Sequence, residues 1–128
     1  MKLISANLMR YRNDLPSGEE VWVGVLRRLP FSETVPRSLI LAASFRFETG
    51  EQGRVHQGHL DLIDQDGTNF ARMNFPVVAS PDVSASVWYD DRCIDFSTLK
   101  FPHPGRFEFV ISVDGDILGK AVVMLLDE

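Results

Sequence analysis

The stretch Asp64-Gln65-Asp66-Gly67 places two carboxylates before a glycine, a pattern that could bind a metal ion. Ca²⁺ takes oxygen ligands, and a calcium loop supplies them at alternating positions of the form D-x-[DN]-x-[DN]-G-x₅-E. Aligning Gly67 with the glycine of that pattern places Leu62 and Met73 at two ligand positions. Neither side chain can bind the ion. We therefore interpret Asp66 and Gly67 as the residues of a turn.

A second pair of aspartates flanks a glycine in Asp114-Gly115-Asp116, where alternating apolar segments on both sides indicate a β-hairpin. A two-residue turn at Asp114-Gly115 would place Lys120 on the apolar face. A three-residue loop with a bulge instead pairs Ile111 with Ile117 and points Lys120 to solvent. We predict the bulged loop, with Gly115 at positive φ. Its second arm then buries one face, formed by Ile117, Gly119, Ala121, Val123 and Leu125.

Cysteine and histidine are the remaining residues that could act as nucleophile, base or metal ligand. Cys93 could be a nucleophile with His103 as its base, but the glycine signatures that flank catalytic cysteines are absent. His56 and His59 lie three residues apart in a predicted strand and would point to opposite faces. No phosphate-binding, dinucleotide or hydrolase motif occurs in the sequence. We expect a non-enzymatic protein with no catalytic residue, no bound metal and no cofactor.

The elements that must position these residues are short strands separated by turn residues. No segment shows a helical period, no repeat is present, and 128 residues are the size of one domain. The sequence predicts a single all-β domain over residues 1–128, an antiparallel β-sandwich of about eight strands, immunoglobulin-like or C2-like. The predicted strands are Leu3–Met9, Glu20–Leu29, Ser38–Glu48, Arg54–Ile63, Asn69–Val78, Val83–Tyr89 and the two arms of the hairpin within Arg106–Leu126. Residues 90–104 are expected to be the least regular part.

Charge and composition exclude several function classes. The formal net charge of −5 divides into +2 over residues 1–60 and −7 over residues 61–128, which argues against binding to nucleic-acid backbones. No apolar run is long enough for a membrane span, and the first residues lack the features of a signal peptide. A single cysteine, Cys93, suits a reducing compartment. We expect a cytoplasmic protein that binds neither nucleic acid nor membrane.

The last strand of the hairpin is apolar on both faces, which predicts that a loop or a partner covers the second face. Trp22 also lies on the opposite side of its strand from a row of valines, and Arg27 and Arg28 lie near the end of that strand. We predict a protein-binding or assembly module, with a protein partner or a second copy of the chain. Its interface candidates are Leu118, Val122, Met124, Leu126, Trp22, Arg27 and Arg28.

Two alternatives to this prediction remain open. The first is a small-ligand or nucleotide-binding sandwich whose pocket lies among the loops around residues 30–37 and 90–104. The second is an enzyme centred on Cys93 and His103.

Four segments give the chain a resemblance to a family: "KLISANLM", "PSGEEVWVGVLRRL", "LDLIDQDG" and above all the ending "FPHPGRFEFVISVDGDILGKAVVMLL". The layout resembles an uncharacterised bacterial family of small β-sandwich domains of unknown function, about 130 residues long. The resemblance implies the sandwich fold and a bacterial, cytoplasmic origin, and it transfers no catalytic residue.

Overall fold

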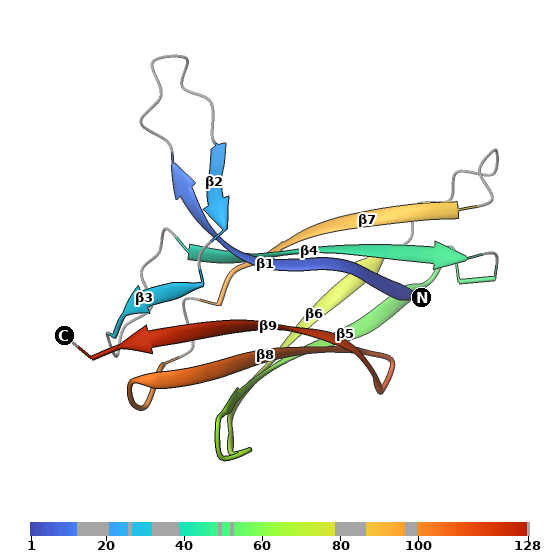
Figure 1. The fold of residues 1–128 in the computed structure, drawn as a ribbon. Helices are drawn as coiled ribbons and strands as arrows, with labels where there is room; N and C mark the ends of the chain where they lie inside the picture. The colour runs from blue at the N-terminus through green and yellow to red at the C-terminus, as the bar shows by residue number, and fades with distance from the viewer. Residues whose placement is uncertain are drawn as a thin grey trace.

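A computed structural model describes residues 1–12, 21–25, 27–31, 39–48, 50–51, 53–78, 87–96 and 100–127. The described residues form nine strands and no helix, stacked as two sheets (Figure 1). This confirms the predicted all-β sandwich. The strands are β1 Lys2–Arg12, β2 Val21–Val25, β3 Arg28–Pro30, β4 Leu39–Glu48, β5 Val55–Asp64, β6 Asn69–Val78, β7 Val87–Ile94, β8 Gly105–Val113 and β9 Asp116–Leu126.

The two sheets differ in size and in their order of strands. One has four strands in the order β2-β1-β4-β7, and the other has five in the order β3-β9-β8-β5-β6. All neighbouring pairs are antiparallel except β3 and β9, which are parallel. Among the described residues, β9 therefore has a full-length partner on one side, β8, and only the three residues of β3 on the other.

Phenylalanines dominate the core between the sheets, as their buried positions in alternating strands require. Phe45 of the four-stranded sheet meets Phe75 of the five-stranded sheet with ring centroids 6.3 Å apart. Phe96 and Phe101, from the segment between β7 and β8, pack on Phe109 of β8. Seven of the nine phenylalanines are buried: Phe45, Phe47, Phe75, Phe96, Phe101, Phe107 and Phe109.

The single strand predicted over Glu20–Leu29 is wrong, because the chain changes sheets within it. Val21–Val25 pairs with β1 in the four-stranded sheet, whereas Arg28–Pro30 pairs with β9 in the five-stranded sheet. The row of valines at odd-numbered positions ends at Val25, and Leu26-Arg27-Arg28-Leu29 breaks the alternation at the change of sheet, a break that the prediction of one strand overlooked.

The segment around residue 90 also differs from its prediction. β7 extends to Ile94, so the first residues of the predicted irregular segment belong to a strand at the edge of its sheet. The predicted start of this strand at Val83 lies outside the described residues. Edge strands pair on one side only and tolerate polar residues, which explains why apolar alternation did not identify Asp90–Cys93.

The turn of the final hairpin contains two residues, not the three predicted. Asp114 and Gly115 have φ values of 51° and 88°, and positive φ at both positions is what a type I′ turn requires. Val113 pairs with Asp116, directly across the turn. The predicted positive φ at Gly115 is present, but the predicted three-residue loop is not.

A bulge two residues beyond the turn shifts the register of β8 and β9. Ser112 pairs with Ile117, but the next pair is Ile111 with Gly119, so Leu118 is an extra residue on β9. The predicted pairing of Ile111 with Ile117 is therefore wrong, and Ile117 is 75% exposed. Beyond the bulge the faces are as predicted: Ala121, Val123 and Leu125 are buried and Lys120 is exposed.

Candidate binding groove

A groove of about 770 Å³ runs between β1 and the C-terminal half of β9. β1 supplies one wall, β9 supplies the floor, and the residues just before and within β3 supply one end. The lining residues are Ala6, Asn7, Leu8, Arg27, Arg28, Arg106, Lys120, Ala121, Val122, Met124 and Leu126.

The even-numbered residues of β9 form the apolar part of this groove. Val122, Met124 and Leu126 are 38%, 37% and 39% exposed, which is high for large apolar side chains on a central part of a sheet. They are exposed because the odd-numbered residues of the strand already fill the core. The result is an apolar strip that no described part of the chain covers.

Four cationic side chains surround this strip. Arg106 and Lys120 both contact one carboxylate, Glu108, with nitrogen–oxygen distances of 2.9 Å. The hydrogen bond from Lys120, opposed by desolvation and assisted by Arg106, holds the pKa of Glu108 below its usual value. Glu108 thus stays ionised and offsets one of the four positive charges.

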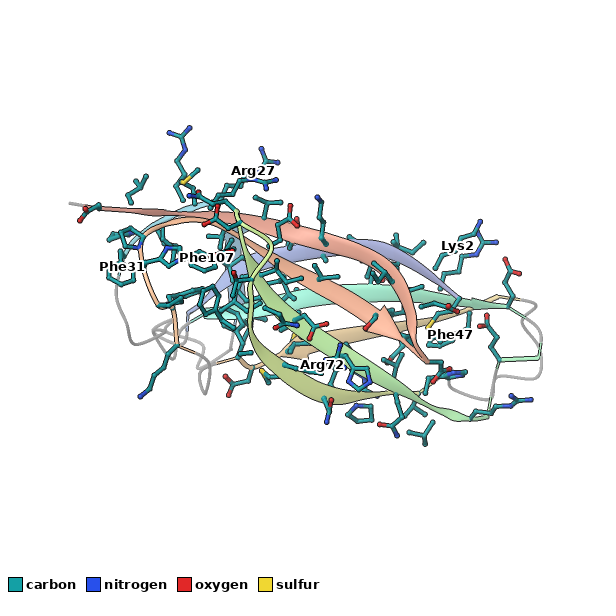
Figure 2. All side chains as sticks on the ribbon, turned by 90° about the horizontal axis from the view of Figure 1, so that it is seen from below. Lys2, Arg27, Phe31, Phe47, Arg72 and Phe107 are labelled. Carbon is teal, nitrogen blue, oxygen red and sulfur yellow. The ribbon has the colours of Figure 1, made fainter. Side chains whose placement is uncertain are left out.

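Arg27 and Arg28 are exposed, and within the described ranges no carboxylate lies within 4.0 Å of either guanidinium. In Figure 2 the Arg27 side chain extends away from the ribbon near the C-terminal end of β9. The register places Arg28 and Arg106 on either side of Met124, one on each neighbouring strand. Since neighbouring strands are about 4.8 Å apart, the backbones of these two arginines lie roughly 10 Å from one another, with the methionine between them. The groove therefore combines an apolar floor with an excess of positive charge.

A model of the family of unknown function DUF6941 matches residues 18–124. The chain belongs to this family. The matched range includes the floor of the groove as far as Met124 and its four cationic residues, Arg27, Arg28, Arg106 and Lys120. A comparison with curated proteins found no match.

Five of the seven interface candidates lie together in this DUF6941 groove. They are Arg27, Arg28, Val122, Met124 and Leu126. Leu118 lies elsewhere, because the bulge turns it toward the core, where it is partly buried. The side chain of Trp22 lies outside the described part of the structure.

Sequence reasoning did not identify Arg106 and Lys120 as groove residues. Lys120 could have been predicted from the sequence, because it lies on the same face of the last strand as Val122 and Met124. Arg106 and the wall residues Ala6 and Leu8 join the groove only through long-range pairing and packing of strands.

The turn aspartate Asp114 contacts a histidine far away in the sequence. The ring of His56 is buried, with Nδ1 at Oδ2 of Asp114 and Nε2 2.8 Å from the carbonyl oxygen of Glu51. The other carboxylate oxygen of Asp114 accepts the backbone N–H of Gln57 at 3.0 Å. Asp114 therefore joins the turn of the hairpin to the start of β5.

Both partners of this pair have shifted pKa values. Burial acts to lower the pKa of His56, but hydrogen bonds to the Glu51 carbonyl and to Asp114 raise it above its ordinary value. The hydrogen bond with His56, together with the Gln57 amide, lowers the pKa of Asp114. The pair is therefore an imidazolium–carboxylate contact with a structural role, because neither ring nitrogen is free to act as a base.

The other predicted turn is organised by the buried carboxylate of Asp64. Its Oδ1 accepts the backbone N–H groups of Asp66 and Thr68, both at 3.0 Å. Gly67 has a φ of 82° and donates to the Asp64 carbonyl at 3.1 Å, which closes the turn. The second oxygen of Asp64 lies 3.2 Å from Nε2 of His103.

The structure does not bring Cys93 and His103 together as nucleophile and base. Cys93 is exposed on β7, opposite Ala42 of β4 in the four-stranded sheet. The two ring nitrogens of His103 contact the Pro104 carbonyl and Asp64. His56 and His59 point to opposite faces of β5, since His59 contacts Asn74 while His56 is buried.

Among the residues that the structure describes, no group of three or more His, Cys, Asp and Glu side chains could hold a metal ion. The same residues contain no helix with the length and hydropathy needed to cross a membrane.

Proposed function

We propose that this DUF6941 protein is a non-enzymatic module that binds a partner protein through the groove on β9. The observation that carries the proposal is the exposed strip of Val122, Met124 and Leu126 beside two arginines that have no carboxylate partner among the described residues. Apolar area together with unpaired cations is what a protein interface with a complementary acidic partner uses.

The contacts of the histidines, which are the candidate general bases, support a binding role over a catalytic one. The described histidines whose contacts are known at both ring nitrogens, His56 and His103, have no free nitrogen for proton transfer. A general base must reach the proton that it abstracts, so neither arrangement favours acid–base chemistry.

The main alternative is a small anionic ligand, because about 770 Å³ is within the range of small-molecule sites. Two features favour a protein. The groove follows the edge of a strand, and its floor continues along three exposed residues of that strand instead of closing around a compact cavity. Residues 30, 31, 90–96 and 100–104, which are the described parts of the loops where the alternative places a ligand pocket, do not line the groove.

The proposal places the protein in the cytoplasm. It has one cysteine, Cys93, and that thiol is free and exposed, which suits a reducing environment.

Site-specific photocrosslinking in the native cell tests the proposal. A benzophenone amino acid at Met124 would report what covers the groove, and the double charge reversal Arg27→Glu with Arg28→Glu would remove the attraction for an acidic partner. We expect one defined protein adduct from Met124 that the double reversal abolishes. The control Lys100→Glu changes charge at an exposed residue outside the groove and should leave the adduct unchanged.

The absence of a Met124 adduct, or an adduct that survives the double reversal, would contradict the proposal. Thermal melting curves of each variant establish that the fold is retained before the adducts are compared.

A further inference from the structure

β9 has an open edge beside the groove. Its residues 124–126 pair with β3, but among the described residues no strand pairs with the part of β9 from Ile117 to Val123 on the side opposite β8. β1 lies next to this part of β9, and the Leu3 side chain is so close to Gly119 that a Cβ added to the glycine would lie 2.7 Å from it. The described residues of β1 and β9 nevertheless form no backbone pairing with each other. Farther along, the groove separates Ala6 and Leu8 of β1 from Val122.

The direction of the peptide groups on this edge follows from two observed hydrogen bonds. The Met124 N–H donates to the Arg27 carbonyl, and the Leu126 carbonyl accepts from the Phe31 N–H, both across the edge of β9 that faces β3. In an antiparallel ladder alternate residues bond to alternate sides. The N–H and C=O groups of Lys120 and Val122 therefore point to the same edge, where no strand of the described residues receives them.

We propose that the partner segment binds as an added strand on this edge of β9, in line with β3. This inference rests on the proposed function and specifies its mode. β-Strand addition supplies affinity through the main chain and specificity through alternate side chains. An unpaired edge of this kind requires either protection or a partner.

The charges of the groove specify the chemistry of the added segment. Side chains on the outward face of the new strand would lie beside Lys120 and near Arg28 and Arg106, which favours Glu or Asp at alternate positions. The intervening side chains would point toward β1, where Ala6 and Leu8 form an apolar wall. The segment that fits is therefore an extended one in which acidic and apolar residues alternate.

A synthetic eight-residue peptide of alternating Glu and Val is the probe for this inference, with fluorescence anisotropy as the measurement. One control peptide has the same composition in two blocks, and a second replaces Glu with Lys. We expect the alternating acidic peptide to bind about tenfold or more tightly than the block peptide, because only alternation matches the two faces of a strand. Equal affinity for the two acidic peptides would overturn the inference.

The substitution Val122→Pro tests strand addition directly. The Val122 N–H points away from β8, so proline removes a donor to the added strand without removing a bond of the β8–β9 ladder. We expect Val122→Pro to weaken peptide binding about tenfold or more, whereas Val122→Ala, which keeps the N–H, should change it less than about threefold. Equal losses in the two variants would overturn the inference.

A second measurement keeps the test decisive if Val122→Pro does not fold. In the wild-type chain, the amide protons of Lys120 and Val122 should exchange at least about tenfold more slowly when the alternating peptide is bound, because they would enter hydrogen bonds. Unchanged exchange with peptide bound would overturn strand addition.

The outcomes separate this inference from the proposed function. If the Met124 adduct depends on Arg27 and Arg28 but Val122→Pro leaves it unchanged, the protein-binding function stands and strand addition is wrong. If the chain forms a dimer that the peptide dissociates, the occupant is a second copy and the assignment to an acidic segment of another protein is wrong.

Discussion

Two regions on the outer face of the five-stranded sheet differ in whether their charged side chains have partners within the sheet. On β5 and β6, Asp61 receives two hydrogen bonds from Arg72, at 2.7 and 3.1 Å, and His59 contacts Asn74. We call these four residues the paired strip. In the β9 groove, Arg27 and Arg28 have no carboxylate partner among the described residues, and apolar side chains lie between the cations.

The difference between the two regions follows from register. Asp61 and Arg72 are direct cross-strand partners, as are His59 and Asn74, so each polar group of the paired strip finds its complement within the sheet. In the groove the cross-strand row reads Arg28, Met124, Arg106, which brings like charges together around an apolar residue. The hydrogen bonds from Arg72 hold the pKa of Asp61 below its usual value, despite desolvation. The comparison indicates that the paired strip serves the fold and the groove is available to a partner.

The largest expected effect comes from the core residue that supports both regions. Phe109 lies between Leu62 of β5 and Ala121 of β9 in the register and is fully buried. Phe109→Ala should lower the free energy of unfolding by about 3–5 kcal/mol, measured by urea denaturation, and should weaken the paired strip and the groove together. A loss under about 1 kcal/mol would mean that the two regions do not depend on a shared core.

The next prediction separates the regions. Arg72→Ala removes the bidentate partner of the nearly buried Asp61 carboxylate and should lower the melting temperature by about 3–8 °C without affecting peptide binding in the groove. Calorimetry and anisotropy on the same preparation give both values. A melting temperature that does not change would show that the paired strip is not structural.

The contact between His56 and Asp114, which lies outside both regions, makes stability depend on pH through a histidine as well as a carboxylate. Because the folded pKa of His56 lies above the ordinary histidine value of 6.5, its stabilisation is fully present below pH 6.5 and is lost as the pH rises through the folded pKa. The folded pKa of Asp114 lies below 3.8, so its contribution is present above pH 3.8 and is lost as the pH falls through the folded value.

The substitution His56→Phe keeps the ring packing on Phe47 and removes both hydrogen bonds. At a pH between 3.8 and 6.5, where both groups contribute, the substitution should lower the free energy of unfolding by about 1–3 kcal/mol. The difference from the wild-type chain should be smaller at alkaline pH. Urea denaturation over a pH series measures this difference. A difference that grows with rising pH would contradict the assignment of a protonated His56.

A smaller effect on stability is expected at the turn between β8 and β9. Gly115 has a φ of 88° with open space around it, so a larger side chain meets backbone strain and no clash. Gly115→Val should cost roughly 1–2 kcal/mol of unfolding free energy in chemical denaturation. A cost below half of that value would mean that the turn changes type to accommodate valine.

The smallest effect on stability is expected in the groove itself. Arg28→Ala, matched to Arg72→Ala on the same sheet, should change the free energy of unfolding by less than about 0.5 kcal/mol, because no described carboxylate loses a partner. Peptide binding should nevertheless weaken. A destabilisation equal to that of Arg72→Ala would remove the distinction between the two regions.

Local alternation was enough to predict the strands that lie within one sheet and have one buried face. The predicted Asn69–Val78 has the bounds of β6, and the predicted Ser38–Glu48 agrees with β4 from Leu39 to Glu48, while Ser38 lies outside the described residues. The break in alternation at Arg27-Arg28 does not by itself say that the chain leaves one sheet for the other, so β2 and β3 were predicted as one strand. The bulge at Leu118 was placed wrongly for a related reason, since two different registers give the same buried face beyond it.

The candidate site was predicted in part, and the rest depends on contacts between distant segments. The unusual second apolar face of the last strand identified Val122, Met124 and Leu126, and the nearby Arg27 and Arg28 also belong to the groove. The contact of His56 with Asp114 spans 58 residues, and no local pattern could predict it. Asp66 and Asp114 were assigned to turns by their motifs, whereas the contacts of Asp114 with His56 and of Asp64 with His103 are visible only in the fold.

The central claim is that the unpaired arginines of the groove attract an acidic segment of a partner. The most direct test measures the affinity of the alternating Glu and Val peptide for the wild-type chain and for the double variant Arg27→Glu, Arg28→Glu, with Lys100→Glu as a charge-reversal control outside the groove. We predict a loss of about tenfold or more in the double variant and less than about twofold in the control. Equal losses in both variants, or no loss in either, would contradict the account.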